Sequence, residues 1–346
     1  MPDMLAHSEV AEAARLRLPR GPLADVLLTE HPAYRVGAQG PDFFFYSHVW
    51  PGSRSRGDLA FLVHRHKMGE VFRTMLAAAA EAPPAERRVL TAWTCGYAAH
   101  LCADATAHPW ILYWTGDVTG RDAAARRRHG TLEASIDVTL RRRRSDDPAW
   151  IRRQRLLDLP DRPRDIVAEL WERIMRDVYG VAFTAAEGRA ALRDMARVYG
   201  SMTDRRSPLS RTLRAMAPAI DRDGLMRTQL YPGRPHRAAA ALFSTRRPWC
   251  YPSIPDEPRT ETLSELLRSA VGQAVVCLEA IGAALSGSLT GGAGQAAGRS
   301  GGVSAGDLEA ALAVIGERDM ITGVPCEDPR PLVAFAPGLE QAWGLG

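Results

Sequence analysis

Apolar residues recur at helical spacing along most of the chain. Leu59, Leu62 and Val63, for example, are spaced three and four apart, which puts them on one face of a helix. No segment alternates apolar and polar residues clearly enough to predict a strand. The same helical pattern predicts helices over 8–17, 58–81, 85–107, 121–144, 164–179, 184–200 and 259–285. We therefore predict an all-α fold.

Helix-breaking and capping residues suggest where these elements end. The first helix is expected to begin at Ser8, a favoured N-cap residue. The helix over 85–107 is expected to end before Pro109, because the residue preceding a proline is biased away from helical geometry. Proline, glycine and aromatic residues interrupt the pattern over 31–48, which is expected to be a loop.

A low-complexity segment near the C-terminus divides the chain. Residues 286–306 are almost entirely Gly, Ser and Ala, the composition of a flexible linker. We therefore expect one helical domain over 1–285, the linker over 286–306, and a C-terminal appendix over 307–346. The appendix either docks on the helical domain or hangs free.

Composition narrows the class of protein. The chain has 346 residues, of which 46% are hydrophobic and 24% charged, as in an ordinary globular protein, and its net charge of +4 does not argue for nucleic acid. Five cysteines without any CxxC spacing argue against a disulfide framework or a cysteine zinc site. The N-terminus lacks the basic start and apolar run of a secretory signal, and no run of about 18 apolar residues is evident. We expect a cytoplasmic protein without a transmembrane segment.

Metal-type side chains lie at helical spacing in two segments. In "GYAAHLCADATAHPW" three such residues, His100, Asp104 and His108, lie four apart, and "HGTLEASID" repeats the device with His129 and Glu133. Side chains four apart share one helix face. Two helices that each present a histidine and a carboxylate are typical of a bundle with metal in its core, and these ligand types suit Zn²⁺. The alternative is that they are solvated faces or capped core histidines.

Together with upstream segments, these motifs resemble the zinc-dependent phospholipase C family, which shares its fold with the S1/P1-type nucleases. The resemblance follows the family's order over 7–137 and has a further echo in "RRPWCYPSIPDEPRTETLSELLRSAVGQAV". The remaining segments that carry it are "LAHSEVAEAA", "GAQGPDFFFY" and "VHRHKMGEVF". It implies an all-α, multi-helix bundle of the phospholipase C / P1 nuclease type with a zinc cluster in its cleft.

The resemblance also implies which residues hold the metal. One zinc would be held by His64, His100 and Asp104 with Asp42 close by, a second by His108, His129 and Glu133, and a third by His7 with Asp104 bridging. His66 is the alternative to His64. Family members complete the third site with a processed N-terminal tryptophan that this chain lacks. That site is therefore missing, weak, or completed by water or Asp3, and we expect two zinc ions with the third left open.

The implied activity is hydrolysis of a phosphodiester by a metal-activated water, most simply phospholipase C-type cleavage of a phospholipid headgroup. Asp42 is the expected catalytic residue, as a general base or metal ligand. The aromatic residues that follow it, Phe43, Phe44 and Tyr46, are expected to bind substrate, or else to fill the core behind the turn. The expected partner is a phospholipid or other phosphodiester, with peripheral membrane contact. The alternatives are an S1-P1-type nuclease or nucleotidase, which the arginine runs 126–128 and 141–144 favour only weakly, and a catalytically silent, metal-stabilised binding module.

Overall fold

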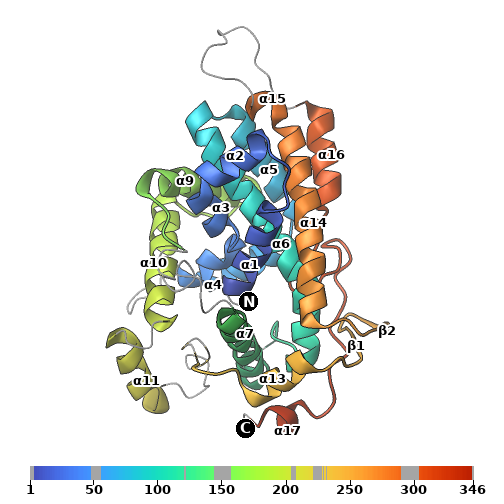
Figure 1. The fold of residues 1–346 in the computed structure, drawn as a ribbon. Helices are drawn as coiled ribbons and strands as arrows, with labels where there is room; N and C mark the ends of the chain where they lie inside the picture. Colours follow the sequence, from blue (N-terminus) through green and yellow to red (C-terminus); the bar gives the residue numbers. More distant parts are fainter. Residues whose placement is uncertain are drawn as a thin grey trace.

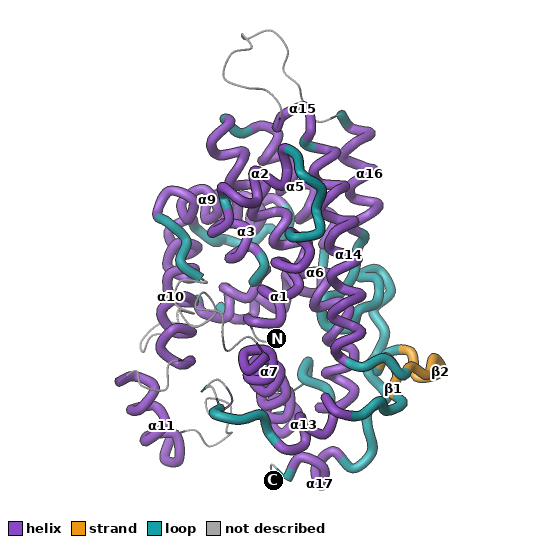
Figure 2. The backbone as a smooth tube through the Cα atoms, viewed as in Figure 1, coloured by secondary structure: helices purple, strands orange, loops and turns teal. Residues whose placement is uncertain are grey.

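The computed structural model describes residues 4–47, 56–120, 122–143, 157–203, 208–220, 228, 230, 232–289 and 304–344. Helices make up nearly all of the regular structure, with one short hairpin (Figures 1 and 2). The predicted all-α fold is confirmed. The elements are α1 (Met4–Arg15), α2 (Pro22–Thr29), α3 (His31–Gly37), the 3₁₀ helix η1 (Gly40–Tyr46), α4 (Gly57–Arg65), α5 (Met68–Glu81), α6 (Pro84–Thr115), α7 (Ala123–Arg143), α9 (Asp161–Asp177), α10 (Ala185–Thr203), α11 (Pro208–Ile220), α13 (Arg237–Ser244), β1 (Trp249–Tyr251), β2 (Ile254–Arg259), α14 (Leu263–Ala284), α15 (Ser286–Leu289), α16 (Ala305–Ile315) and α17 (Leu339–Trp343).

The long helix α6 lies at the centre of the molecule (Figure 1). Helices α1, α3, α5, α7, α9 and α14 all pack against it. Its sequence is apolar on every side and rich in small residues, so it is buried nearly all around from Val89 to Leu112. Because α6 also carries His100, Asp104 and His108, the core of the fold and the predicted metal site share one element.

The expectation that this helix ends before Pro109 is wrong, because α6 continues to Thr115 with Pro109 inside it. A proline has no backbone N–H, so the carbonyl of Ala105 loses the helical partner that residue 109 would supply. Packing on all sides outweighs this local cost.

Other elements also differ from the sequence prediction. Helix α1 begins at Met4, so Ser8 is buried inside the helix and does not cap it. The described part of the segment predicted as a loop is largely helical, as α3 and η1. Each of these helices has a proline in its first turn, where the missing N–H costs nothing. The single helix predicted over 58–81 is broken at Lys67, which has a left-handed φ of 58°. The hairpin β1–β2 has no counterpart among the predicted elements.

The described part of the C-terminal region packs on the helical body. Helix α16 lies against α14 and α5. Further on, the N–H of Ala336 donates to the carbonyl of Tyr113 at 2.8 Å, and Trp343 Nε1 donates to the carbonyl of Trp114 at 2.9 Å. Residues 286–289 of the predicted linker form α15, and 290–303 lie outside the described residues. The division of the chain into domains stays a prediction.

One helix of the described residues, α14, is long and apolar enough to cross a membrane, with 39% of its most apolar 18-residue window buried in the protein. The sequence pattern did not indicate this candidate. The core helix of a soluble protein passes the same test, and α14 packs along α6, α1 and α16. Length and hydropathy alone therefore decide nothing about a membrane here.

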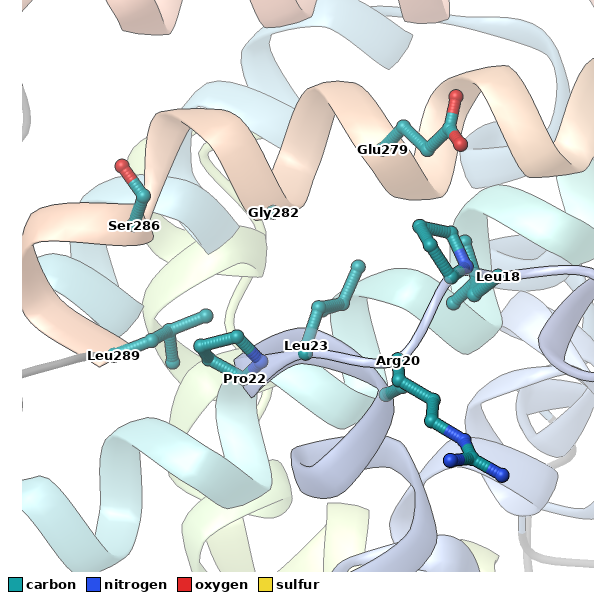
Figure 3. A pocket seen from close by; sticks show the side chains of 11 residues that line it. Leu18, Arg20, Pro22, Leu23, Glu279, Gly282, Ser286 and Leu289 are labelled. Carbon is teal, nitrogen blue, oxygen red and sulfur yellow. The ribbon is translucent and has the colours of Figure 1, made fainter.

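A groove of about 270 Å³ separates the α1–α2 connection from the C-terminal half of α14 (Figure 3). Leucine and proline side chains form much of its lining. Leu23 points from one wall toward Gly282 on the other, and a Cβ at Gly282 would lie 2.8 Å from Leu23 Cδ2. The groove contains none of the predicted metal ligands.

Candidate metal centre

Five separate elements bring the eight predicted ligands together in the interior. Helix α6 supplies three of them and α7 supplies two, while α1, η1 and α4 supply one each. All eight side chains are buried: His7, Asp42, His64, His100, Asp104, His108, His129 and Glu133. His66, the alternative to His64, is exposed at the end of α4. The structure thus favours His64 at this position.

The eight side chains form three groups, two of which share His100, and within each group the donor atoms lie within 4.8 Å of one another. We name each by one member. The members are His64, His100 and Asp104 in the His64 group; His108, His129 and Glu133 in the His108 group; and His7, Asp42 and His100 in the His7 group. The first two match the sets expected from the resemblance. The third puts Asp42 and His100 beside His7, and Asp104, which the resemblance implied there, also lies 3.2 Å from His7 Nε2.

Asp104 stands between the His64 and His7 groups. Its Oδ2 lies 3.1 Å from His100 Nε2 and 3.6 Å from His64 Nε2, and its Oδ1 lies 3.2 Å from His7 Nε2. Asp42 Oδ1 lies 3.1 Å from His64 Nε2. One carboxylate therefore faces imidazoles of two groups, which is the placement expected of a bridging ligand.

The His108 group is built across two helices. Glu133 Oε1 lies 2.8 Å from His129 Nε2, one turn away on α7, and 3.4 Å from His108 Nε2 on α6. The α6–α7 contact thus brings together ligands that the sequence shows only as two separate pairs.

The donor atoms fit a metal ion better than they fit one another. Within the described residues, no hydrogen-bond partner of acceptable geometry exists for Nε2 of His7, His64, His100 and His108, for Oδ1 of Asp42, or for either carboxylate oxygen of Asp104. Buried polar atoms are nearly always hydrogen-bonded, because an unpaired one costs about 1–3 kcal/mol. Ring nitrogens and carboxylate oxygens that converge without satisfying each other are what a cation site requires.

In three of these histidines the other ring nitrogen, Nδ1, donates a hydrogen bond to a backbone carbonyl. His64 Nδ1 donates to the carbonyl of Ala60 at 2.6 Å, His100 Nδ1 to that of Ala38 at 3.2 Å, and His108 Nδ1 to that of Met320 at 2.9 Å. A carbonyl can only accept, so each Nδ1 carries the proton and each Nε2 has a lone pair facing the centre. This arrangement is the usual support of metal-binding histidines.

Burial and charge set the protonation states that a metal needs. Burial lowers the pKa of His100, and it lowers that of His129 to about 4, so both imidazoles are neutral at pH 7. Burial raises the pKa of Asp104, but the surrounding histidines outweigh it and hold that pKa well below its usual range. Burial likewise opposes the charge on His64, yet Asp42 raises its pKa. A proton and a metal ion therefore compete for His64 Nε2.

The aromatic residues after Asp42 divide between core and site. Phe43 and Phe44 are fully buried and pack edge-on against Trp171, with ring centroids 5.4 and 5.2 Å away. The substrate-binding role predicted for these two is therefore not supported, because neither reaches solvent in the described structure. Tyr46 is partly buried, and its role stays a prediction. Phe45 belongs to the same aromatic run, and its ring centroid lies 6.0 Å from that of His64.

Local packing fixes the ligands in place. Gly40 precedes Asp42 with a left-handed φ of 53°, and a Cβ there would lie 2.2 Å from His100 Cδ2, so only glycine lets the ring fit. Asp137 on α7 is buried and accepts the N–H groups of Leu5 and Ala6 at 3.0 and 3.2 Å. It thereby caps α1 just before His7.

An all-helical fold that gathers histidine and carboxylate donors from five elements defines a helical bundle with an interior metal site. The chain belongs to the zinc-dependent phospholipase C family: the family described as zinc dependent phospholipase C matches residues 6–181, about half of the chain. That stretch includes all eight predicted ligands. No curated protein and no solved structure matches the chain.

Sequence reasoning missed the supports that come from far away in the chain. Met320 lies outside the matched stretch, yet its carbonyl holds His108. No local pattern signals such a contact, because a backbone carbonyl carries no residue type. Asp3, one of the groups considered for completing the third site, lies outside the described residues.

Proposed function

We propose that the protein is a zinc-dependent phosphoric diester hydrolase that cleaves the headgroup from a phospholipid in the manner of a phospholipase C. The observation that carries the proposal is the convergence of buried, unsatisfied imidazole and carboxylate atoms in three groups, in a chain of this family. Zinc bound there would lower the pKa of water and neutralise the phosphate oxygens.

The residues of the chain have distinct tasks in this reaction. The backbone carbonyls of Ala38, Ala60 and Met320 orient the imidazoles so that each Nε2 faces the candidate metal centre, where these histidines would hold zinc. Asp42 has one oxygen toward His64 and is the group positioned to accept a proton from the attacking water. The oxygen of that water bonds to phosphorus as the bond between phosphorus and the diacylglycerol oxygen breaks, and the proton that Asp42 accepts is available to the leaving oxygen.

One arginine of the first run, Arg128, is not placed to bind nucleic acid, whereas Arg126, Arg141 and Arg142 are exposed. Arg128 is buried, donating from Nε to the carbonyl of Thr115 at 2.7 Å and facing Asp122 at 3.6 Å. An arginine engaged in this way does not offer its charge to a phosphate backbone. The cytoplasmic location and a peripheral contact with membranes remain parts of the proposal.

The test begins with the metal content of protein purified without chelator. We expect two to three zinc ions per chain and hydrolysis of p-nitrophenylphosphorylcholine. Less than one zinc per chain would remove both hydrolase hypotheses. Zinc without turnover on vesicles of phosphatidylcholine or phosphatidylethanolamine would point to a silent module, and turnover on single-stranded DNA alone would point to a nuclease.

The variant Asp42→Asn tests the catalytic role. We expect kcat to fall by about 10²–10⁴-fold, the usual contribution of a general base, while most of the zinc is retained. Asp58→Asn is the matched control, because this exposed aspartate begins the helix that carries His64. Full activity in Asp42→Asn would refute the assignment.

A further inference from the structure

A single residue near the C-terminus contacts candidate ligands of two different groups. Met320 is fully buried, and its N–H donates to the carbonyl of His64 at 2.9 Å. Its own carbonyl accepts from His108 Nδ1 at 2.9 Å. We infer that residues 317–326, here called the 320 loop, are a positioning element that fixes His64 and His108 for metal binding through the backbone of Met320.

The contact with His108 decides which nitrogen of that ring faces the metal. The carbonyl of Met320 is closer to His108 Nδ1 than Asp104 Oδ1 is, at 2.9 against 3.7 Å. With the proton held on Nδ1, the lone pair of Nε2 points toward Glu133, 3.4 Å away. Without the carbonyl of Met320, Nδ1 of His108 loses this acceptor. Neither the tautomer of His108 nor the orientation of its ring is then fixed.

The contact with His64 anchors the end of a helix. His64 is the second-to-last residue of α4, where backbone carbonyls have no partner within the helix. The N–H of Met320 supplies that partner. Fixing the backbone of His64 also fixes the origin of its side chain, whose Nδ1 is held by Ala60 one turn earlier.

The 320 loop is internally braced, so its position is defined. The N–H of Cys326 donates to the carbonyl of Glu317 at 3.1 Å, and the N–H of Asp319 to that of Val324 at 2.8 Å. Asp319 Oδ1 accepts the N–H groups of the two residues that follow Met320, at 2.7 and 3.1 Å. Its Oδ2 pairs with Arg65, the neighbour of His64, at 3.1 Å.

Gly323 lets the 320 loop pack closely against α6 near Pro109. Its φ is +73°, and a Cβ there would lie 2.6 Å from the carbonyl oxygen of Ala105 and 2.8 Å from Pro109 Cγ. Ala105 is the residue whose carbonyl Pro109 leaves without a helical partner, and it follows Asp104 directly. The loop thus fits against the irregular part of α6 that lies between two candidate ligands.

This inference rests on the proposed metal centre, so its test includes a measurement on metal-free protein. The variant is Gly323→Ala, in which the new Cβ pushes the loop off α6. Gly316→Ala is the matched control, because Gly316 has the same φ of +73° and a Cβ added there would have nothing within 4 Å. Both variants bear the strain of a left-handed alanine, and only the first displaces the loop.

The first readout is the tautomer of His108 in metal-free protein, measured by nitrogen NMR and assigned with His108→Gln. We expect the Nδ1–H form in the parent and in Gly316→Ala, and a mixture in Gly323→Ala. The second readout is zinc affinity by chelator competition, which we expect to fall about 10–100-fold in Gly323→Ala alone. An Nε2–H tautomer in the parent, or parental affinity in folded Gly323→Ala, overturns the inference.

A second pair of variants covers the case in which Gly323→Ala does not fold. Asp319→Ala removes the brace of the loop, and Asp319→Asn keeps an oxygen for the same two N–H groups. With Co²⁺ in place of zinc, we expect the visible spectrum to change in Asp319→Ala and to be restored in Asp319→Asn. Unchanged spectra in both argue against a positioning role. A parent that binds no metal refutes the proposed function, while the tautomer still tests the loop.

Discussion

At the scale of single residues, Asp104 shows how a buried carboxylate is kept charged. It has no exposed surface, and burial alone would favour its neutral form. His108, His100 and His7 surround it and hold its pKa well below the usual range. Asp104 therefore stays an anionic candidate ligand although it is buried.

Glu12 offers a pH test away from the metal centre. Burial raises its pKa, but hydrogen bonds from His31 and Arg15 outweigh that effect and lower it to about 2. A depressed carboxyl pKa stabilises the folded state above the ordinary value of 4.5, and this contribution disappears as the pH falls toward 2. We expect Glu12→Gln to cost about 1–2 kcal/mol at pH 7, after allowing for solvent screening.

Urea unfolding at several pH values checks this prediction. The difference between Glu12→Gln and the parent should shrink as the pH is lowered from 4.5 toward 2. The exposed Glu279 on α14 provides the control, and Glu279→Gln should change stability little at any pH. A difference that stays constant from pH 7 to pH 3 would contradict the assigned ion pair.

At the scale of elements, the crossing of α3 and α6 depends on missing side chains. A Cβ at Gly96 would lie 2.2 Å from the carbonyl oxygen of Tyr34, and one at Gly37 would lie 2.6 Å from that of Trp93. The two backbones therefore touch. Because α3 leads directly into η1, this contact sets the position of Asp42, and it places the carbonyl of Ala38 beside His100.

Gly96→Ala is expected to force α3 away from α6. Overpacking of this kind costs about 1–3 kcal/mol, and we also expect weaker zinc binding because Asp42 moves. Gly272→Ala is the control within another helix, since nothing lies within 4 Å of the added methyl. It should stabilise the protein by about 0.4–1 kcal/mol. Thermal melts compare the two, and a parental melting temperature in Gly96→Ala would mean that the helices can separate freely.

The helices could be predicted from periodicity, and their ends could not. The apolar pattern gives α6, α9 and α14, because burial on one or all faces dominates their energy. The pattern wrongly predicts that α6 ends before Pro109, because tertiary packing outweighs the local preference there. It also fails to predict β1 and β2, which are too short for an alternating pattern to be visible.

The candidate site could be predicted only in part for a similar reason. Spacing alone links His100 with Asp104 and His129 with Glu133, since each pair lies on one helix. His7 and His64 lie on other elements, so only the family resemblance identified them. Whether Phe43 and Phe44 are buried or exposed depends on which side of η1 faces Trp171. A short 3₁₀ segment has no periodicity in its sequence from which this could be predicted.

At the scale of the whole molecule, metal binding and folding are linked. The candidate ligands come from α1, η1, α4, α6 and α7, so ions bound in the three groups together stabilise the arrangement of all five. We expect a chelator to lower the melting temperature, by the equivalent of about 3–4 kcal/mol when free zinc is 100 to 1,000 times its dissociation constant.

Adding a metal ion back to the chelator-treated protein distinguishes a specific site from general ionic effects. Zn²⁺ should return the melting temperature to its starting value, whereas Mg²⁺ should not, because it prefers oxygen ligands in octahedral geometry. If chelation leaves the melting curve unchanged in protein that contained zinc, the metal does not hold these elements together.

The placement of Met320 has a consequence for biosynthesis. A nascent chain leaves the ribosome with its N-terminus first, so all eight candidate ligands emerge long before the backbone that steadies His64 and His108. A growing chain that ends before Met320 therefore lacks both backbone contacts, to the carbonyl of His64 and to the ring of His108.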